Sequence, residues 1–194
     1  MSSRENILNA IAINQPTLVP LPVIERSAVI NYEDHFVQFK SVLESIGGHT
    51  ELIPNLEVLK EIIRVDKAND TYIIDTITEE SSNNEEYISV SAFELEKVDR
   101  AYIRGTVGVA ENGAVWVYES QMKNRVLPFI CQHLVLVIDK KDIVATMHEA
   151  YDTIDAGSEG FGVFIAGPSK TADIEQSLVI GAHGARSATV YVVE

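Results

Sequence analysis

The segment Gly167-Pro-Ser-Lys-Thr171 combines groups that bind anions: a glycine, two hydroxyls and a lysine ammonium. The apolar run Phe161–Ala166 before it is typical of a buried strand. Ser169 or Thr171 can cap a helix with its hydroxyl, and Asp173 favours the first turn of such a helix. The sequence therefore predicts a helix from about Thr171 to Ala182. A helix N-terminus after a buried strand presents free N–H groups to a negative ligand. The predicted ligand-binding residues for a small carboxylate or phosphate are Gly167, Ser169, Lys170, Thr171 and Asp173; the alternative is an ordinary capped turn.

Two other residues are candidates for catalysis. Glu111 precedes Asn112-Gly113, a pair that favours a tight hairpin turn. A carboxylate on such a turn beside a pocket can act as a nucleophile or a general base. If the hairpin tip instead projects into solvent, Glu111 would be structural. His133 enters an apolar stretch, where a histidine is either a pocket group or a satisfied core residue.

Several polar residues have simpler explanations. Gly184 is placed to end the predicted helix, and we interpret His183 and Arg186 as packing or subunit contacts, because that end should lie opposite the proposed pocket. Arg104 and Arg125 have the geometry to bind a carboxylate, although surface solvation explains them equally well. The five His residues are dispersed, so the sequence predicts no metal site.

The composition narrows the class of protein. A net charge of −14 disfavours nucleic acid and anionic membranes, which attract basic proteins. The single Cys131 excludes an internal disulfide and an iron–sulfur cluster held by this chain alone, and it fits a reducing compartment. No apolar run approaches the roughly 20 residues that span a bilayer. We therefore expect a cytoplasmic protein without a cofactor of its own.

The pattern of elements predicts an α/β fold. Residues 1–25 read as a short amphipathic helix and a proline-rich extended connector, and residues 26–194 as a single domain. Helices are expected near 31–46, 55–65, 90–96, 141–154 and 171–182, and strands near 49–53, 71–77, 98–104, 106–110, 114–118, 134–138, 161–166 and 188–193. Residues 78–86 and 120–131 are expected to be loops. The βαβαβ order of the last third predicts parallel strands.

Three segments resemble the LUD (lactate utilization) domain family, of the lactate utilization protein C type. They are Ile103–Val117, with Asn112 where the family usually has Thr; Arg125–Val137, with its Leu-Pro…His pattern; and Gly167–Glu175 with Gly181–Arg186. The resemblance covers roughly residues 30–194. It implies a three-layer α/β fold with a mostly parallel sheet, similar to the sugar-phosphate isomerase and coenzyme A transferase superfamily. Ala110-Glu111-Asn112-Gly113 is similar to the transferase segment that carries the nucleophilic glutamate, although the glycine-rich oxyanion segment is missing.

The resemblance also implies a function. It points to an accessory component of bacterial L-lactate oxidation to pyruvate that acts with iron–sulfur partner proteins. Two alternatives stay open: an acyl or phosphate-ester enzyme that uses Glu111, and a non-catalytic anion-binding regulator. The sequence leaves open the ligand, a homo-oligomeric state and whether the chain catalyses anything alone.

Overall fold

The computed structural model describes residues 2–20, 22–25, 29–69, 72–78, 89–155, 157, 159–174, 177–181 and 183–194, with backbone only for 172–174 and 177–179. Its helices are α1 (Ser3–Ile13), α2 (His35–Ser45), α3 (Leu56–Lys67), α5 (Ala92–Leu95), α6 (Glu119–Met122), α7 (Leu127–Ile130), the 3₁₀ turn η3 (Lys140–Asp142) and α8 (Met147–Thr153). Its strands are β1 (His49–Ile53), β2 (Ile73–Asp75), β3 (Arg100–Arg104), β4 (Val107–Val109), β5 (Ala114–Tyr118), β6 (His133–Asp139), β7 (Ile143–Val144), β8 (Gly162–Ile165), β9 (Lys170–Ile174), β10 (Ser177–Ile180) and β11 (Ser187–Val193).

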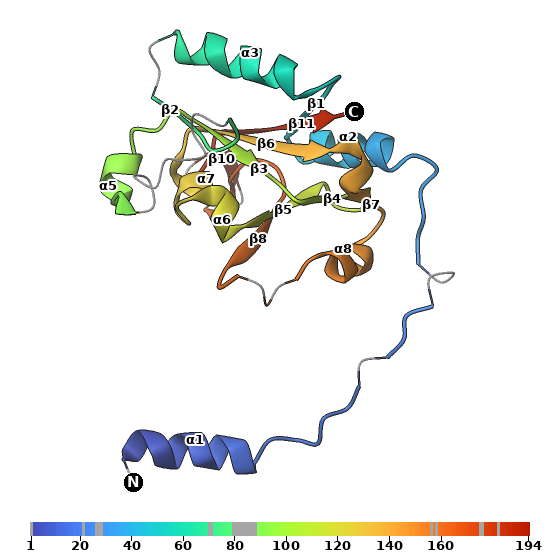
Figure 1. Ribbon diagram of the computed structural model, residues 1–194, viewed down its shortest axis with the longest axis vertical. Helices are drawn as coiled ribbons and strands as arrows, with labels where there is room; N and C mark the ends of the chain where they lie inside the picture. Colours follow the sequence, from blue (N-terminus) through green and yellow to red (C-terminus); the bar gives the residue numbers. More distant parts are fainter. Residues whose placement is uncertain are drawn as a thin grey trace.

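The central sheet is parallel throughout, in the order β1-β11-β6-β3-β2. A second, mixed sheet has the order β7-β4-β5-β8. Figure 1 shows α3 above the central sheet, the second sheet below it and α8 below that. The predicted α/β class with a mostly parallel central sheet is confirmed, whereas the separate mixed sheet was not expected.

Alternation of side chains along β6 explains this layering, because successive residues of a strand face opposite sides of a sheet. Val135 and Val137 pack with Leu59 and Ile63 of α3. Leu134 and Leu136 face the interior and join the main core. That core also takes Phe39 and Leu43 of α2 and Val115 and Val117 of β5, so it fills the space between the two sheets. A third cluster, which includes Trp116 and Ala150, seals α8 against the outer face of the second sheet.

Most local predictions agree with the structure. Asn55 caps α3 by accepting hydrogen bonds from Glu57 N and Val58 N. Gly47, with φ of 87°, follows the end of α2 as expected. The predicted hairpin joins β4 to β5, and Gly113 takes the positive φ of 68° that the turn needs.

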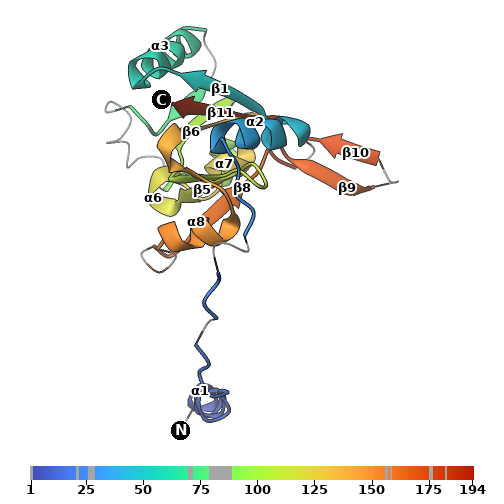
Figure 2. The ribbon, with the colours of Figure 1, turned by 90° about the vertical axis from the view of Figure 1, so that its right-hand side faces the viewer.

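The prediction of a helix from Thr171 to Ala182 is wrong. Residues 170–174 and 177–180 form instead the antiparallel strand pair β9–β10, which pairs with neither sheet and projects from the body (Figure 2). The physical reason lies in the sequence: Thr171, Ile174, Val179 and Ile180 are β-branched residues that favour strands. Asp173, read as a first-turn residue, lies within β9.

The predicted helix from Lys141 to Ile154 is also wrong in its first half. Ile143–Val144 pairs with β4, and α8 begins only at Met147, after Thr146 as its cap. Because β8 pairs antiparallel with β5, the expected βαβαβ unit does not form; of its strands, β6 and β11 lie parallel in the central sheet.

Two smaller predictions also differ from the structure. Asp34, not Asn31, caps α2, accepting a hydrogen bond from Val37 N. The expected loop 120–131 contains α7 and most of α6 as single helical turns. The loop expected at 78–86 lies, except for Thr78, outside the described residues.

Among the described residues, no helix is both long and apolar enough to cross a bilayer.

Candidate functional site

A cavity of about 250 Å³ lies beside the turn from β8 to β9, and we call it the β8–β9 cavity. It is lined by Pro128, Phe129, Leu134, Phe164, Ile165, Ala166, Gly167, Pro168, Ser169, His183, Gly184 and Ala185. These residues come from the Arg125–Val137 segment, the strand β8 with its following turn, and the Gly181–Arg186 segment. Two of the segments singled out in the sequence therefore meet around one hollow.

The strand-to-hairpin turn explains how these segments meet. Gly167 has a φ of +72°, which turns the chain out of β8. Ser169 N donates to Ala185 O at 2.9 Å, and Gly181 N donates to Ser169 O at 2.9 Å. Because β10 runs back antiparallel to β9, the chain returns to the turn that follows β8. His183 therefore lines the same cavity as Ser169. The expectation that His183 would lie opposite the pocket is wrong, because it assumed a helix.

The lining is mainly apolar, and Ser169 and His183 supply its polar side chains. Lys170 and Thr171, which were predicted as ligands, begin β9 and do not line this cavity; Lys170 is exposed. The side chain of Asp173 lies outside what the structure describes. The structure thus brings together Gly167 and Ser169 of the predicted set and adds His183, for which the sequence predicts only a packing or subunit contact.

His133 lies at a second, smaller hollow of about 70 Å³. Its Nδ1 is 2.7 Å from Ser187 Oγ. Arg100, His133 and Ser187 share one row of the sheet, and Thr189 and Tyr191 continue the hollow along β11. Leu134 lines both hollows, yet it faces the core while His133 faces the α3 side, so the two sites are on opposite faces of the sheet.

Arg100 does not offer an unpaired charge to that hollow. Its guanidinium pairs with Asp66, whose carboxylate also accepts a hydrogen bond from the Tyr102 hydroxyl. Burial, followed by the hydrogen bond to Asp66, raises the pKa of Tyr102 well above its ordinary value. This cluster anchors α3 to the central sheet. No local sequence pattern indicates it, because Asp66 and Tyr102 are 36 residues apart.

Glu111 is half-buried and has a structural partner. Its Oε1 accepts a hydrogen bond from Met147 N at 2.7 Å, and its own N donates to Ala145 O at 3.1 Å. Glu149 Oε2 accepts from Ala145 N at 2.9 Å. The two carboxylates together satisfy backbone donors at the start of α8. Glu111 does not line the β8–β9 cavity or the His133 hollow.

The two arginines proposed as carboxylate ligands also have partners. Arg125 binds Glu119 through two hydrogen bonds of 2.6 and 2.8 Å and stacks over Phe161. Arg104 pairs with Asp139 at 2.6 Å, although its Nη1 is buried without a partner among the described residues. Within the described part of the chain, no group of three or more His, Cys, Asp or Glu side chains is placed to hold a metal ion.

Comparison with known proteins identifies the family. The LUD domain model matches residues 38–193, and the chain belongs to that family. The chain is 36% identical over 93 residues to lactate utilization protein C of Geobacillus sp. (strain WCH70), covering 45% of this chain and 39% of the relative. It is 37% identical over 93 residues to the protein of that name from Shouchella clausii (strain KSM-K16), covering 45% and 41%. Lactate utilization protein C of Anoxybacillus flavithermus is 35% identical over 103 residues, covering 51% and 47%. These matches span less than half of each relative.

A solved structure supports the fold. The crystal structure of a DUF162 family protein from Deinococcus radiodurans superposes with a TM-score of 0.59 at 18% identity. The match covers 82% of this chain and 96% of that one.

Proposed function

We propose that this protein is an accessory component of bacterial L-lactate oxidation to pyruvate and that the β8–β9 cavity binds a short carboxylate. The convergence of the segments Arg125–Val137, Gly167–Glu175 and Gly181–Arg186 on this cavity carries the proposal. These segments resemble the LUD family, and the curated relatives are named for lactate utilization.

The chemistry of the cavity favours a small ligand with one apolar end. Its volume of about 250 Å³ falls just below the range typical of drug-sized sites. Phe129, Phe164 and Ala185 provide apolar surface for a methyl group. The Ser169 hydroxyl and the His183 imidazole can donate hydrogen bonds to a carboxylate. Lactate and pyruvate have this combination of groups, whereas a sugar phosphate would bring hydroxyls that apolar walls cannot satisfy.

In this proposal the electron transfer belongs to iron–sulfur partner proteins. The single cysteine, Cys131, is buried, and burial raises the pKa of its thiol to about 12, so it is a poor metal ligand. The purified chain alone should therefore be colourless and free of stoichiometric iron and sulfide. Stable co-purification with cysteine-rich redox proteins would support the accessory role.

Two other functions remain as competing outcomes. The acyl or phosphate-ester enzyme depends on Glu111, and the hydrogen bond from Met147 N supports a capping role for that carboxylate. A non-catalytic regulator would bind the same carboxylate without any requirement for lactate-dependent growth.

Calorimetric titration with L-lactate, D-lactate, pyruvate and inorganic phosphate tests the ligand. We expect binding of L-lactate or pyruvate, weakened about tenfold by Ser169→Ala or His183→Gln, on the scale of one hydrogen bond. His49→Gln removes an exposed histidine elsewhere and serves as the control. Failure of both carboxylates to bind would refute the ligand.

Growth tests the pathway separately. A strain that lacks this protein should fail to grow on L-lactate and recover with the parent but not with the Ser169→Ala, His183→Gln double variant. Normal growth of the deletion strain on L-lactate would refute the accessory role, even if the cavity binds a carboxylate.

A further inference from the structure

The N-terminal arm, residues 2–31, differs in character from the rest of the chain. It contains two arginines and two glutamates, so its net charge is zero and the whole charge of −14 falls on residues 32–194. None of the residues of its helix α1 is buried. Figures 1 and 2 both show α1 at the far end of an extended connector, away from the α/β body. The LUD domain match begins only at residue 38, so the arm is separate from the shared domain.

One face of α1 carries an exposed apolar stripe. Arg4, Ile7, Leu8 and Ile11 follow the i, i+3, i+4, i+7 spacing that places them in one stripe. The three apolar side chains are 57%, 53% and 56% exposed. Ser2 and Glu5 form a capping box, so the start of the helix is satisfied locally. An isolated helix of 11 residues is nevertheless marginal in water, and its stability depends on burying such a stripe.

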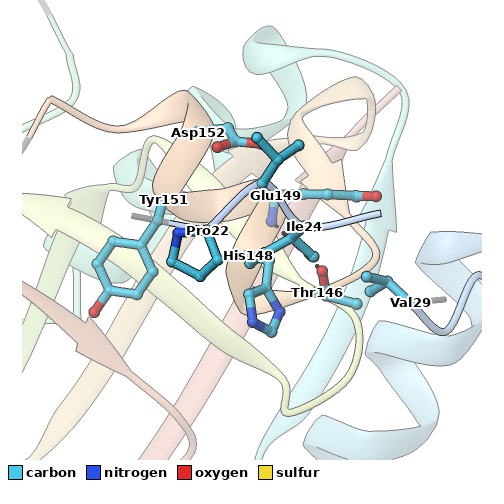
Figure 3. A pocket seen from close by; sticks show the side chains of 9 residues that line it. Pro22, Ile24, Val29, Thr146, His148, Glu149, Tyr151 and Asp152 are labelled. Carbon is cyan, nitrogen blue, oxygen red and sulfur yellow. Dashed lines mark hydrogen bonds between the residues drawn. The ribbon is translucent and has the colours of Figure 1, made fainter. Parts of the chain in front are cut away.

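A cavity beside α8 has lining residues that match this stripe in chemistry. It has a volume of about 550 Å³, lies between α8 and the connector, and is called the α8 cavity here (Figure 3). Pro22, Val23, Ile24 and Val29 form its apolar connector side, and Tyr151 adds an aromatic ring from α8. Glu149 and Asp152 bring negative charge to the same lining. An apolar stripe with one arginine at its end therefore complements this cavity in both hydrophobicity and charge.

The connector disfavours docking of α1 into its own α8 cavity. Pro16 and Pro20 stiffen the chain between α1 and Pro22, where the cavity begins, and proline-rich linkers act as semi-rigid extended spacers. The connector does not restrict docking of α1 into the α8 cavity of a second copy. The arm, being neutral, can also approach the acidic body of another copy without the charge repulsion that two bodies would feel.

We propose that α1 of one copy docks into the α8 cavity of a second copy, and that the exchange is reciprocal in a two-fold symmetric dimer. Arg4 faces the acidic part of the partner's cavity, and Ile7, Leu8 and Ile11 fill its apolar part. Exchange of an identical element is a low-cost route to a dimer, because each copy donates and accepts the same contact.

Sedimentation velocity over a range of concentrations tests the dimer. We expect the parent to be dimeric and Ile7→Glu/Ile11→Glu to raise the dimer dissociation constant at least 100-fold. Asn6→Glu/Asn9→Glu adds the same charge to the opposite face of α1 and should leave the constant unchanged. Because no residue of α1 is buried, these variants should retain the folded body, which thermal unfolding checks.

A charge exchange tests the docking site itself. Arg4→Asp and Asp152→Arg should each weaken self-association at least tenfold, because like charges then meet in both contacts of each dimer. An equimolar mixture of the two variants should regain the parent affinity, since both contacts of the mixed dimer pair opposite charges. Failure of the mixture to recover, or a dimer that both α1 variants leave intact, would overturn the proposal. So would a monomeric parent at the highest soluble concentration, whether α1 then docks within its own chain or onto another protein.

Discussion

Gly184 and Ser169 are in such close contact that a methyl group at position 184 would fit only if its neighbours moved by a few tenths of an ångström. A Cβ at position 184 would lie 3.1 Å from Ser169 Cβ, 3.2 Å from Ser169 Oγ and 3.3 Å from Phe129 O. All three residues line the β8–β9 cavity. The glycine in the Gly181–Arg186 segment is therefore explained by its approach to Ser169, rather than by the helix ending predicted from the sequence.

Replacing Gly184 by Ala should weaken ligand binding while leaving the fold intact. The added methyl group must displace Ser169 by a few tenths of an ångström, which misplaces its hydroxyl. We expect a loss of affinity for L-lactate or pyruvate of up to about tenfold, the scale of one hydrogen bond. Gly157→Ala is the control, because among the described residues its Cβ would meet only Asp155 Oδ1, at 3.4 Å. Unchanged calorimetric affinity in the Gly184 variant would argue against a role for Ser169 in binding.

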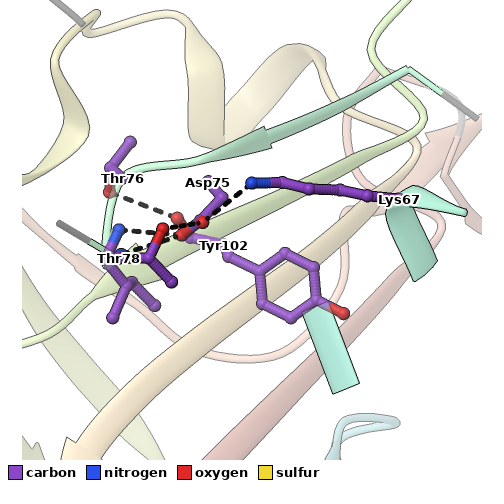
Figure 4. A network of polar contacts seen from close by, with 6 residues as sticks. Lys67, Asp75, Thr76, Thr78 and Tyr102 are labelled. Carbon is purple, nitrogen blue, oxygen red and sulfur yellow. Dashed lines mark hydrogen bonds and ion pairs between the residues drawn. The ribbon is translucent and has the colours of Figure 1, made fainter. Parts of the chain in front are cut away.

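Asp75 stabilises the carboxyl end of β2 through a network that the sequence did not reveal (Figure 4). Its side chain is fully buried and accepts hydrogen bonds from Ile77 N, Thr78 N, Thr78 Oγ1 and Lys67 Nζ. Asp75→Asn should lower the free energy of unfolding by about 1.5–3 kcal/mol, because hydrogen bonds to a charged acceptor are lost. Urea denaturation measures this, with the exposed Glu33→Gln as the control.

The contribution of Asp75 should depend on pH. Burial alone would raise the pKa of its carboxyl, but the hydrogen bonds from Thr78, Ile77 and Lys67 outweigh burial and lower the pKa below the ordinary value of 3.8. A lowered pKa in the folded state stabilises the protein above the unfolded pKa, and this stability is lost as pH falls through the folded value. The difference in unfolding free energy between parent and Asp75→Asn should hold from pH 7 to about 5 and shrink below about 4. A difference that grows on acidification would contradict this account.

Much of the fold could be predicted because local chemistry and tertiary packing agree. The cap at Asn55, the Asn112-Gly113 turn and the apolar run of β6 each specify their structure over a few residues. The hairpin β9–β10 was missed because Ser169, Thr171 and Asp173 are equally typical of a helix start, and that local signal outweighed the β-branched pattern after it.

The candidate site was predicted only in part for the same reason. Gly167 and Ser169 were identified by their residue types, and they do line a cavity. The sequence predicts His183 at the far end of a helix, away from the pocket. In the structure β10 runs back antiparallel to β9, so His183 lines the same cavity as Ser169. Partners distant in sequence, such as Glu111 with Met147, leave no pattern in a single sequence.

Cys131 should be unreactive in the folded protein. Burial raises the pKa of its thiol to about 12, so at pH 8 the thiol is almost entirely protonated. We expect negligible reaction with a disulfide reagent such as DTNB at pH 8 in buffer, and one thiol per chain in 6 M guanidinium. Rapid reaction of the folded protein would show that the α7–β6 region opens readily.

Two substitutions of Glu111 distinguish a structural role of this residue from a catalytic one. Its carboxylate accepts a hydrogen bond from Met147 N, the first residue of α8, so Glu111→Ala should destabilise the protein by about 1 kcal/mol, the usual cost of losing a helix cap. Glu111→Gln keeps an acceptor oxygen at the same position and should cost less than about 0.5 kcal/mol. Because glutamine is neither a nucleophile nor a base, the two variants separate capping from chemistry. We expect Glu111→Gln to support growth on L-lactate as well as the parent does, with urea denaturation confirming its stability. A Gln variant that is as stable as the parent but fails to support growth would restore Glu111 as a catalytic residue and revive the enzymatic alternative.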